Sequence, residues 1–143
     1  MLERINLQSG VAVFAQIENE VCFAIASGEL KAGDKLPTVR AVAEKLSINA
    51  NTVAKAYRDL EIMGLVYSRR GMGIFIKDGV EEKCRTECYR EIICKMHEVV
   101  AETKAAGFKE AEVKALAKKC FVSNTSPYDV PPPAILAMVK GKK

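Results

Sequence analysis

The sequence predicts a mainly α-helical protein with a small β-wing, in which a winged helix-turn-helix is followed by a two-helix appendage. Three observations lead to this fold class. Two short amphipathic helices separated by a tight turn are expected within residues 38–64. Two β-like runs joined by a basic, glycine-bearing tip follow directly. Beyond residue 79 the apolar residues follow a long helical pattern.

The elements of the helix-turn-helix can be justified in chain order. Apolar spacing predicts a first helix over residues 11–27, and Gly28 ends it. A Gly-Asp turn and a short extended stretch before Pro37 would add a strand to the small sheet. Thr38 caps a second helix that ends near residue 47, and Asn49 caps a third that ends at Gly64. The expected buried positions are Val39, Val42, Ala43 and Leu46, then Val53, Ala56, Tyr57, Leu60 and Met63.

The remaining elements are a hairpin and two helices. Residues 65–68 and 74–77 are the expected strands, and a tip over residues 69–73 joins them. A long helix over about residues 80–106 is broken by Gly107, and a second amphipathic piece covers residues 109–120. We therefore expect a winged-helix domain over residues 1–78 and a helical region over residues 79–121. Residues 122–143, rich in proline and lysine, are expected to form a mobile tail.

Composition excludes several classes of protein. The chain has 143 residues, of which 49% are hydrophobic and 28% charged, so it can form a core but is too short for a (β/α)8 barrel. No apolar run approaches the ~20 residues of a membrane span and no signal peptide is visible, which predicts a cytoplasmic protein without a membrane partner. Five cysteines without a secretory signal indicate reduced thiols.

The exposed face of the third helix carries the residue types that meet DNA. Projection at 100° per residue places Asn51, Ala54, Lys55 and Arg58 opposite the buried stripe. The N-terminal half of such a helix enters the major groove, and a basic wing tip reaches flanking phosphates or the minor groove. Double-stranded DNA is therefore the expected partner. The candidate DNA-binding residues are Arg40, Asn49, Asn51, Thr52, Lys55, Arg58, Arg69, Arg70, Gly71 and Gly73.

The placement of charge is more informative than its total. The net charge is +4, but residues 1–78 contain ten cations and nine anions, whereas residues 79–143 contain twelve and nine. Between Arg40 and Arg70 six cations face three anions. This local excess, together with the order of the elements around it, favours a nucleic-acid interface.

Three motifs also resemble a known family. They are GxLxxGxxLPTVRxxA over residues 28–43, NxNTVxKAYRxLExxG over residues 49–64 and RRGxGxF over residues 69–75. In order and spacing they resemble the winged helix of GntR-type bacterial transcription regulators, and the short appendage resembles that of the YtrA-like subfamily. The resemblance implies operator contacts by Arg40, Asn51, Thr52 and Lys55, a wing contact at Arg70 and Gly71, and two helices used for dimerisation. It also implies target genes for ABC-type transport or for envelope stress.

Two positions depart from the family pattern. Ser47 stands where the family usually has glycine, which implies a slightly strained or differently closed turn. Ala54 stands where other GntR subfamilies have arginine, so their base preference does not transfer.

The appendage is expected to mediate homodimerisation. Its first helix has an apolar stripe that is too broad for a lone surface helix, and a second copy of the chain is the economical cover. The candidate interface residues are Cys84, Cys88, Ile92, Met96, Val99, Val100 and Thr103. Cys84, Cys88, Cys94 and His97 do not converge on one helix to make a tetrahedral metal site, so buried or interface thiols are favoured over a metal or thiol sensor.

The sequence therefore favours a homodimeric repressor that binds a palindromic operator. His97 has no companion nucleophile and no phosphate loop is present, so we expect neither an enzyme nor a cofactor. A small-molecule effector bound between protomers is left open. The alternative is a winged-helix module that docks a partner protein without specific DNA binding.

Overall fold

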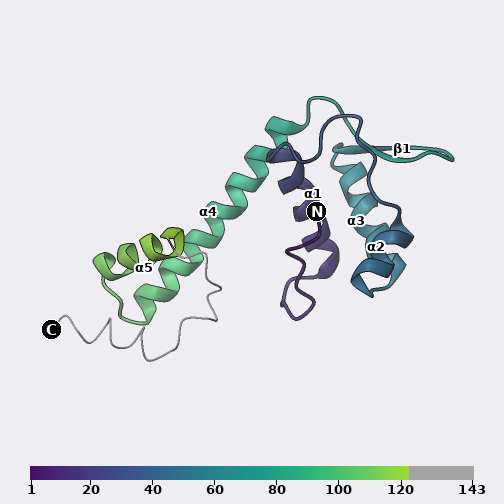
Figure 1. Cartoon of the computed structure of the whole chain (residues 1–143). Coiled ribbons are helices and arrows are strands. Elements are labelled where there is room, and N and C mark those ends of the chain that lie inside the picture. Colours follow the sequence, from purple (N-terminus) through teal and green to yellow (C-terminus); the bar gives the residue numbers. More distant parts are fainter. Residues whose placement is uncertain (123–143) are drawn as a thin grey trace. The chain divides into compact units, whose positions relative to one another are not determined.

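The computed structural model describes residues 1–122, and the tail expected over residues 122–143 lies outside them except for its first residue. The chain divides into two compact units, Met1–Ile92 and Ile93–Lys143. Figure 1 shows the order of the elements, which confirms the expected sequence of three helices, a hairpin and two further helices. No helix within residues 1–122 is long and apolar enough to cross a membrane.

The first unit contains the helix-turn-helix and its wing. Its helices are α1 (Val13–Ala26), α2 (Val39–Leu46) and α3 (Ala50–Ile62), and its strands are β1 (Val66–Arg69) and β2 (Gly73–Ile76). The helix bounds differ from the predicted ones by one or two residues. Each strand is displaced by one residue toward the tip, because Arg69 pairs with Gly73 and lengthens the ladder there.

The predicted third strand is reduced to a single bridge. Lys35 pairs with Phe75 of β2, and the Leu36 amide donates to the Ile74 carbonyl at 2.9 Å. Pro37 follows directly and has no N–H to continue the ladder. Gly33, at a φ of 83°, turns the chain on the other side. The segment therefore closes the edge of the hairpin without forming a strand.

Local hydrogen bonds fix both ends of the turn between α2 and α3. The Ala41 amide donates to Thr38 Oγ1 at 3.1 Å, and the Asn51 amide donates to Asn49 Oδ1 at 2.8 Å. Both residues are N-caps, as the sequence predicts. After α2 the Ile48 amide donates to the Ala43 carbonyl at 3.0 Å, while Ser47 adopts a φ of 54°. Ser47 thus occupies the left-handed position that glycine usually takes at the end of a helix.

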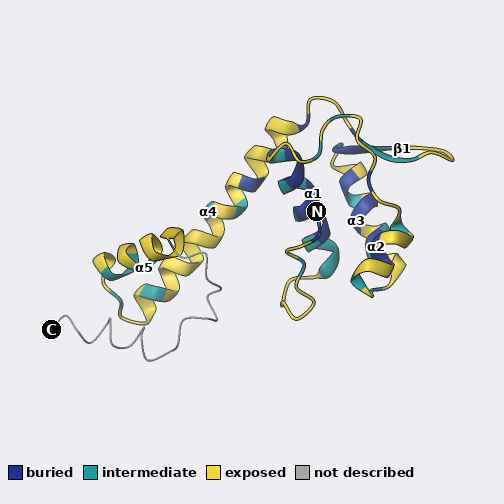
Figure 2. Ribbon diagram, viewed as in Figure 1, coloured by how far each residue is buried: buried dark blue, intermediate teal, exposed yellow. Residues whose placement is uncertain are grey.

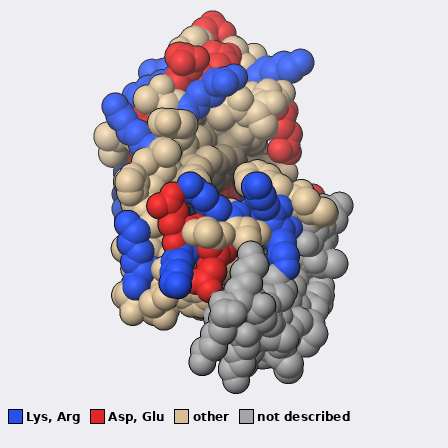
Figure 3. All heavy atoms as spheres, turned by 90° about the vertical axis from the view of Figure 1, so that its left-hand side faces the viewer, with Lys and Arg blue, Asp and Glu red and all other residues tan. Residues whose placement is uncertain are grey.

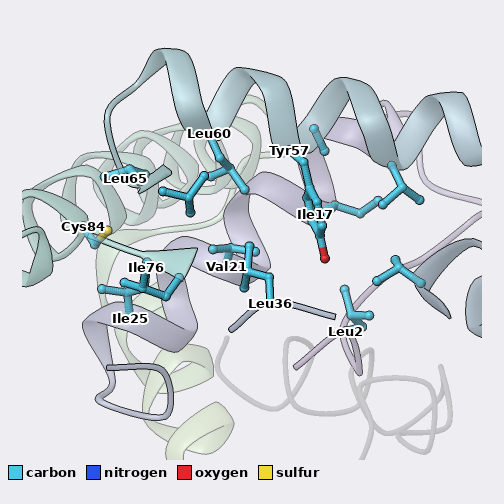
Figure 4. Packing of buried hydrophobic residues seen from close by; sticks show 14 of the residues in the cluster. Leu2, Ile17, Val21, Ile25, Leu36, Tyr57, Leu60, Leu65, Ile76 and Cys84 are labelled. Carbon is cyan, nitrogen blue, oxygen red and sulfur yellow. The ribbon is translucent and has the colours of Figure 1, made fainter. Parts of the chain in front are cut away.

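The core of this unit lies between α1, α3 and the hairpin (Figure 4). In Figure 4, Ile17, Val21 and Ile25 of α1 lie in one packed layer with Tyr57 and Leu60 of α3. Of the predicted buried positions, Val42, Ala43, Val53, Ala56, Tyr57 and Leu60 are buried. Val39 and Leu46 are only partly buried at the margin of this cluster. Met63 is 39% exposed, so its predicted burial is wrong, because α3 ends at Ile62 and the chain turns away there.

The first turns of α4 (Glu81–Ala105) belong to the first unit. Val80 and Cys84 are members of the hydrophobic core, and Asn19 Nδ2 of α1 donates to Glu91 Oε1 at 2.8 Å. The compact unit consequently extends to Ile92, whereas the sequence prediction placed the domain boundary after residue 78. The reason is that the start of α4 supplies apolar side chains to the winged-helix core.

The second unit contains the rest of α4 and helix α5 (Glu110–Val122). Gly107, at a φ of 84°, ends α4, and the Phe108 amide donates back to the Thr103 carbonyl at 3.0 Å. The Lys109 amide then donates to Glu112 Oε2 at 2.7 Å, which caps the start of α5. Figure 2 shows that most described residues of this unit are exposed, and α5 has no buried residue.

Candidate nucleic-acid interface

The exposed face of α3 is polar and cationic. Asn51, Lys55 and Arg58 are exposed, and Thr52 is half-buried, while Val53, Ala56, Tyr57 and Leu60 are buried on the other side. An amide and two cations on one face of the second helix of a helix-turn-helix are the groups that bind base edges and phosphates. These four predicted site residues therefore occur on one surface of one helix.

Helix α2 adds a cation next to this surface. The Arg40 side chain is 89% exposed and pairs with Glu44 through a contact of 3.0 Å. Such an exposed pair contributes little to stability, so the guanidinium can exchange Glu44 for a phosphate at small cost. Asn49 has a structural task, because its amide oxygen caps α3. Its predicted role in DNA contact is therefore limited to the rest of the side chain.

A buried tyrosine fixes α3 against the start of α2. The Tyr57 hydroxyl donates to the Pro37 carbonyl at 2.8 Å, just before the Thr38 cap. Burial raises the pKa of Tyr57 to about 12, so the hydroxyl remains a donor at any physiological pH. This bond ties the recognition helix to the segment that begins α2.

Lys55 is engaged by its own chain. Its Nζ lies 2.7 Å from Asp59 Oδ2 and 4.1 Å from the ring centroid of Phe14 on α1. The ion pair lowers the pKa of Asp59, mainly through the hydrogen bond from Lys55. The ammonium group thus has a defined position on α3, held between a carboxylate and an aromatic face.

The wing presents two arginines in different settings. The Met72 amide donates to the Arg69 carbonyl at 2.9 Å, and Gly71 adopts a φ of 75° that permits the tight tip. The Arg69 guanidinium lies 5.6 Å from the Tyr67 ring and 5.8 Å from the Phe75 ring. Arg70 is exposed at the tip. Arg69 is therefore placed by aromatic contacts, and Arg70 projects from the turn.

Glu61, which the sequence analysis does not name as a site residue, joins the end of α3 to the wing. Glu61 Oε1 accepts bonds from the Ser68 amide at 3.0 Å and from the Ser68 hydroxyl at 2.9 Å. At Gly73, with a φ of 119°, an added Cβ would lie 2.6 Å from Lys35 Cε. Gly73 thus serves close packing of the hairpin.

Charge is mixed on the face of the molecule drawn in Figure 3. On that face, lysine and arginine side chains are interspersed with aspartate and glutamate, and no continuous field of one sign covers its described part. The local arrangement on α2, α3 and the wing is therefore the feature that indicates a polyanion-binding surface.

The cysteines do not occupy the positions expected of an interface. Cys84 and Cys88 are 0% and 8% exposed, covered within their own chain, and Cys84 belongs to the hydrophobic core against which Cys22 of α1 packs. The prediction that these two residues face a second protomer is therefore corrected. The hydrogen bond to Cys84 and burial raise the pKa of the Cys22 thiol. Among residues 1–122 no three histidine, cysteine or acidic side chains are grouped so as to hold a metal ion.

The sequence reading missed Phe14 and Glu18, the α1 residues next to Lys55 and Asp59. Both occur on α1 with helical spacing, but nothing in a single sequence indicates which helix face meets α3. The signal that was available is Glu18 next to the apolar stripe of the first helix, between Ile17 and Val21.

Comparisons with known proteins agree with this geometry. Residues 14–76 match the bacterial regulatory proteins of the gntR family. The chain is 33% identical over 90 residues to the HTH-type transcriptional regulator YhcF of Bacillus subtilis, covering 62% of this chain and 74% of YhcF. It is 36% identical over 78 residues to the transcriptional repressor YtrA of the same organism, covering 54% of this chain and 60% of YtrA.

A solved structure is similar over most of the chain. The GntR family transcriptional regulator from Listeria monocytogenes superposes with a TM-score of 0.62 at 27% identity, covering 79% of this chain and 98% of the Listeria chain. Residues 14–76, which match the gntR family, include the helix-turn-helix and the wing, where the candidate DNA-binding side chains lie. The chain therefore belongs to the GntR family of bacterial regulatory proteins and is a transcription regulator with a helix-turn-helix DNA-binding domain.

Proposed function

We propose that this chain is a homodimeric repressor that acts in the cytoplasm on a palindromic operator. The observation that carries the proposal is the exposed face of α3, on which Asn51, Lys55 and Arg58 share one side of the helix opposite its buried stripe. Similarity to YtrA, a transcriptional repressor, supports repression. A repressor that occupies its operator excludes or hinders RNA polymerase.

DNA recognition would divide between base edges and phosphates. Asn51 and Thr52, in the first turn of α3, would meet base edges in the major groove. Arg40 of α2 and Arg58 of α3 would neutralise phosphates on either side, and Arg70 would reach the flanking backbone from the wing tip. In this arrangement α3 specifies the sequence, and the surrounding arginines provide affinity that depends on salt.

The second protomer would pack on α4. Its exposed apolar residues lie within an arc of about 100° around the helix. They are Tyr89, Ile92, Met96, Val99 and Val100, with Thr103 half-buried beside them. An apolar stripe of this length on an exposed helix is characteristic of a protein interface. Two copies joined here would present two reading helices to the two halves of a palindrome.

Selection of genomic DNA fragments with the purified protein, followed by sequencing, would identify the operator and the genes beside it. Affinity for that operator is then measured by fluorescence anisotropy for Asn51→Ala and Arg70→Ala. Asn51→Ala should lose about 1–3 kcal/mol of binding and relax the sequence preference at one position. Arg70→Ala should weaken binding to all duplexes alike and reduce the slope of log K against log salt by about 1.

Lys31→Ala is the matched control, because Lys31 is exposed in the segment after α1, outside α2, α3 and the wing. Its affinity should stay within about 0.5 kcal/mol of the unmodified chain. If Asn51→Ala discriminates operator from scrambled duplex as well as the unmodified chain does, the assignment of α3 as the reading helix is wrong.

A further inference from the structure

Two carboxyl groups meet behind the DNA-facing side of α3. Glu18 of α1 lies beside Asp59 of α3, whose side chain and negative charge contribute to the raised pKa of Glu18. Asp59 in turn accepts from Lys55 at 2.7 Å, one helical turn earlier. Phe14, one turn before Glu18 on α1, covers the Lys55 ammonium group at 4.1 Å. The four side chains form one cluster between α1 and α3.

Two ionised carboxylates have only acceptors, so neighbouring carboxyl groups can share a hydrogen bond only when one of them carries a proton. Asp59 is paired with Lys55, which favours its charged form. Glu18 Oε1 is buried and meets no hydrogen-bond donor within residues 1–122. An unsolvated carboxylate oxygen is costly, so Glu18 is the residue that carries the proton.

The charged groups around Glu18 give the same assignment. Burial, followed by the hydrogen bond and the negative charge of Asp59, raises the pKa of Glu18 to about 7, and Lys55 opposes this shift. Arg58 also acts on Asp59 from α3, and Cys22 follows Glu18 by one helical turn on α1. Glu18 therefore changes charge within the physiological range, whereas an ordinary glutamate is fully ionised there.

We propose that Glu18 is a positioning residue for DNA binding: its proton holds Asp59 against Lys55 and keeps a second negative charge away from the recognition helix. The inference rests on the proposed DNA-binding function. When Glu18 loses the proton, two adjacent carboxylates repel each other and compete for Lys55. Helix α1 then also carries an additional negative charge beside the DNA-facing helix α3.

The consequence is a pH-dependent affinity with a defined sign. DNA is a polyanion, so its approach favours the neutral form of Glu18, and binding takes up a proton near pH 7. By reciprocity, affinity falls as pH rises through this range. If DNA raises the pKa of Glu18 by about one unit, affinity decreases roughly tenfold from the acid to the alkaline side.

The test uses the full chain and a labelled duplex recovered by in vitro selection from random sequence, between pH 5.5 and 8.5 at constant ionic strength. Glu18→Gln is permanently neutral and nearly isosteric. It should bind as tightly as the unmodified chain does at low pH and show no decline. His97→Gln is the matched control, because His97 is exposed on α4, outside the cluster that contains Glu18. It should retain the decline.

A second variant tests the same proposal if Glu18→Gln does not fold. Asp59→Asn removes the negative partner of Glu18, so the midpoint of the pH dependence should move well below 7. Circular dichroism establishes that each variant is folded. The positioning role is overturned if Glu18→Gln declines with pH as the unmodified chain does, or if His97→Gln abolishes the decline.

Carbon-13 NMR of the Glu18 carboxyl group in the free protein separates this inference from the proposed function. If Glu18 titrates near pH 7 and no selected duplex binds, the DNA-binding function fails and the positioning role fails with it. If duplexes bind specifically and Glu18 titrates near its ordinary value, DNA binding stands and the positioning role alone is wrong.

Discussion

The hydroxyl group of Tyr57 connects α3 to the segment that begins α2. Tyr57→Phe removes the bond to the Pro37 carbonyl and should lower the free energy of unfolding by about 1 kcal/mol. Because the raised pKa of Tyr57 keeps the hydroxyl neutral in the folded state, its stabilising effect is complete below pH 10 and is lost as pH rises toward about 12.

Urea denaturation of both chains at several pH values checks this expectation. The difference in unfolding free energy between the unmodified chain and Tyr57→Phe should be constant from pH 7 to 9 and should decrease above pH 10. A Tyr57→Phe chain as stable as the unmodified one at pH 7 would show that the bond to Pro37 contributes nothing to the fold.

At the scale of single elements, the end of helix α2 carries measurable strain. Ser47 adopts a φ of 54°, a region in which a side chain costs roughly 1 kcal/mol and glycine costs little. Ser47→Gly should therefore raise the unfolding free energy by up to about 1 kcal/mol. Ser47→Ala retains the Cβ and should give no gain. Thermal and urea unfolding compare the three chains, and equal gains from both variants would contradict the strain.

Thiol reactivity reports the packing of α1 against α4. Cys94 and Cys120 are exposed, whereas Cys84 and Cys88 are buried and Cys22 is half-buried. Burial also raises the pKa of Cys88, which further reduces its thiolate. We expect two thiols to react rapidly with an aromatic disulfide reagent and three slowly, with all five reactive in denaturant. Peptide mass spectrometry after brief alkylation identifies them, and rapid labelling of Cys84 would contradict the packing.

Much of the fold could be predicted because its determinants are local. The caps at Thr38 and Asn49, the left-handed turn at Ser47 and the wing tip at Gly71 each depend on a few neighbouring residues. The exposed face of α3 followed from helical periodicity alone. These features cover most of the candidate site.

The remaining features depend on contacts between distant segments. Asn19 and Glu91 are 72 positions apart, and no periodicity indicates that α1 covers the start of α4. Helical periodicity therefore predicts the apolar stripe of α4 as one dimer surface, although its first part is buried in the core. For the same reason, Glu18 could not be paired with Asp59 from the sequence.

At the scale of the whole molecule, the proposed dimer predicts that a charge placed in its interface lowers the average molecular mass in solution. Met96 is 58% exposed within the α4 stripe, and Met96→Glu would place a charge in the contact. The dissociation constant of the dimer should rise at least about thirtyfold, equivalent to about 2 kcal/mol. Sedimentation equilibrium measures it. Cys94→Glu, on the opposite side of the helix, is the control and should leave the dimer intact; an unchanged mass for Met96→Glu would exclude this surface.

Helix α4 is a single stretch of 25 residues, whose beginning is buried in the winged-helix core and whose later turns are exposed. Each inserted residue rotates everything after it by 100°, so one extra residue between Cys88 and Ile92 would direct the apolar stripe elsewhere. Seven extra residues would restore its direction to within about 20°. Length variation within α4 should therefore be tolerated in steps of whole heptads, whereas the turn at Gly107 can vary more freely.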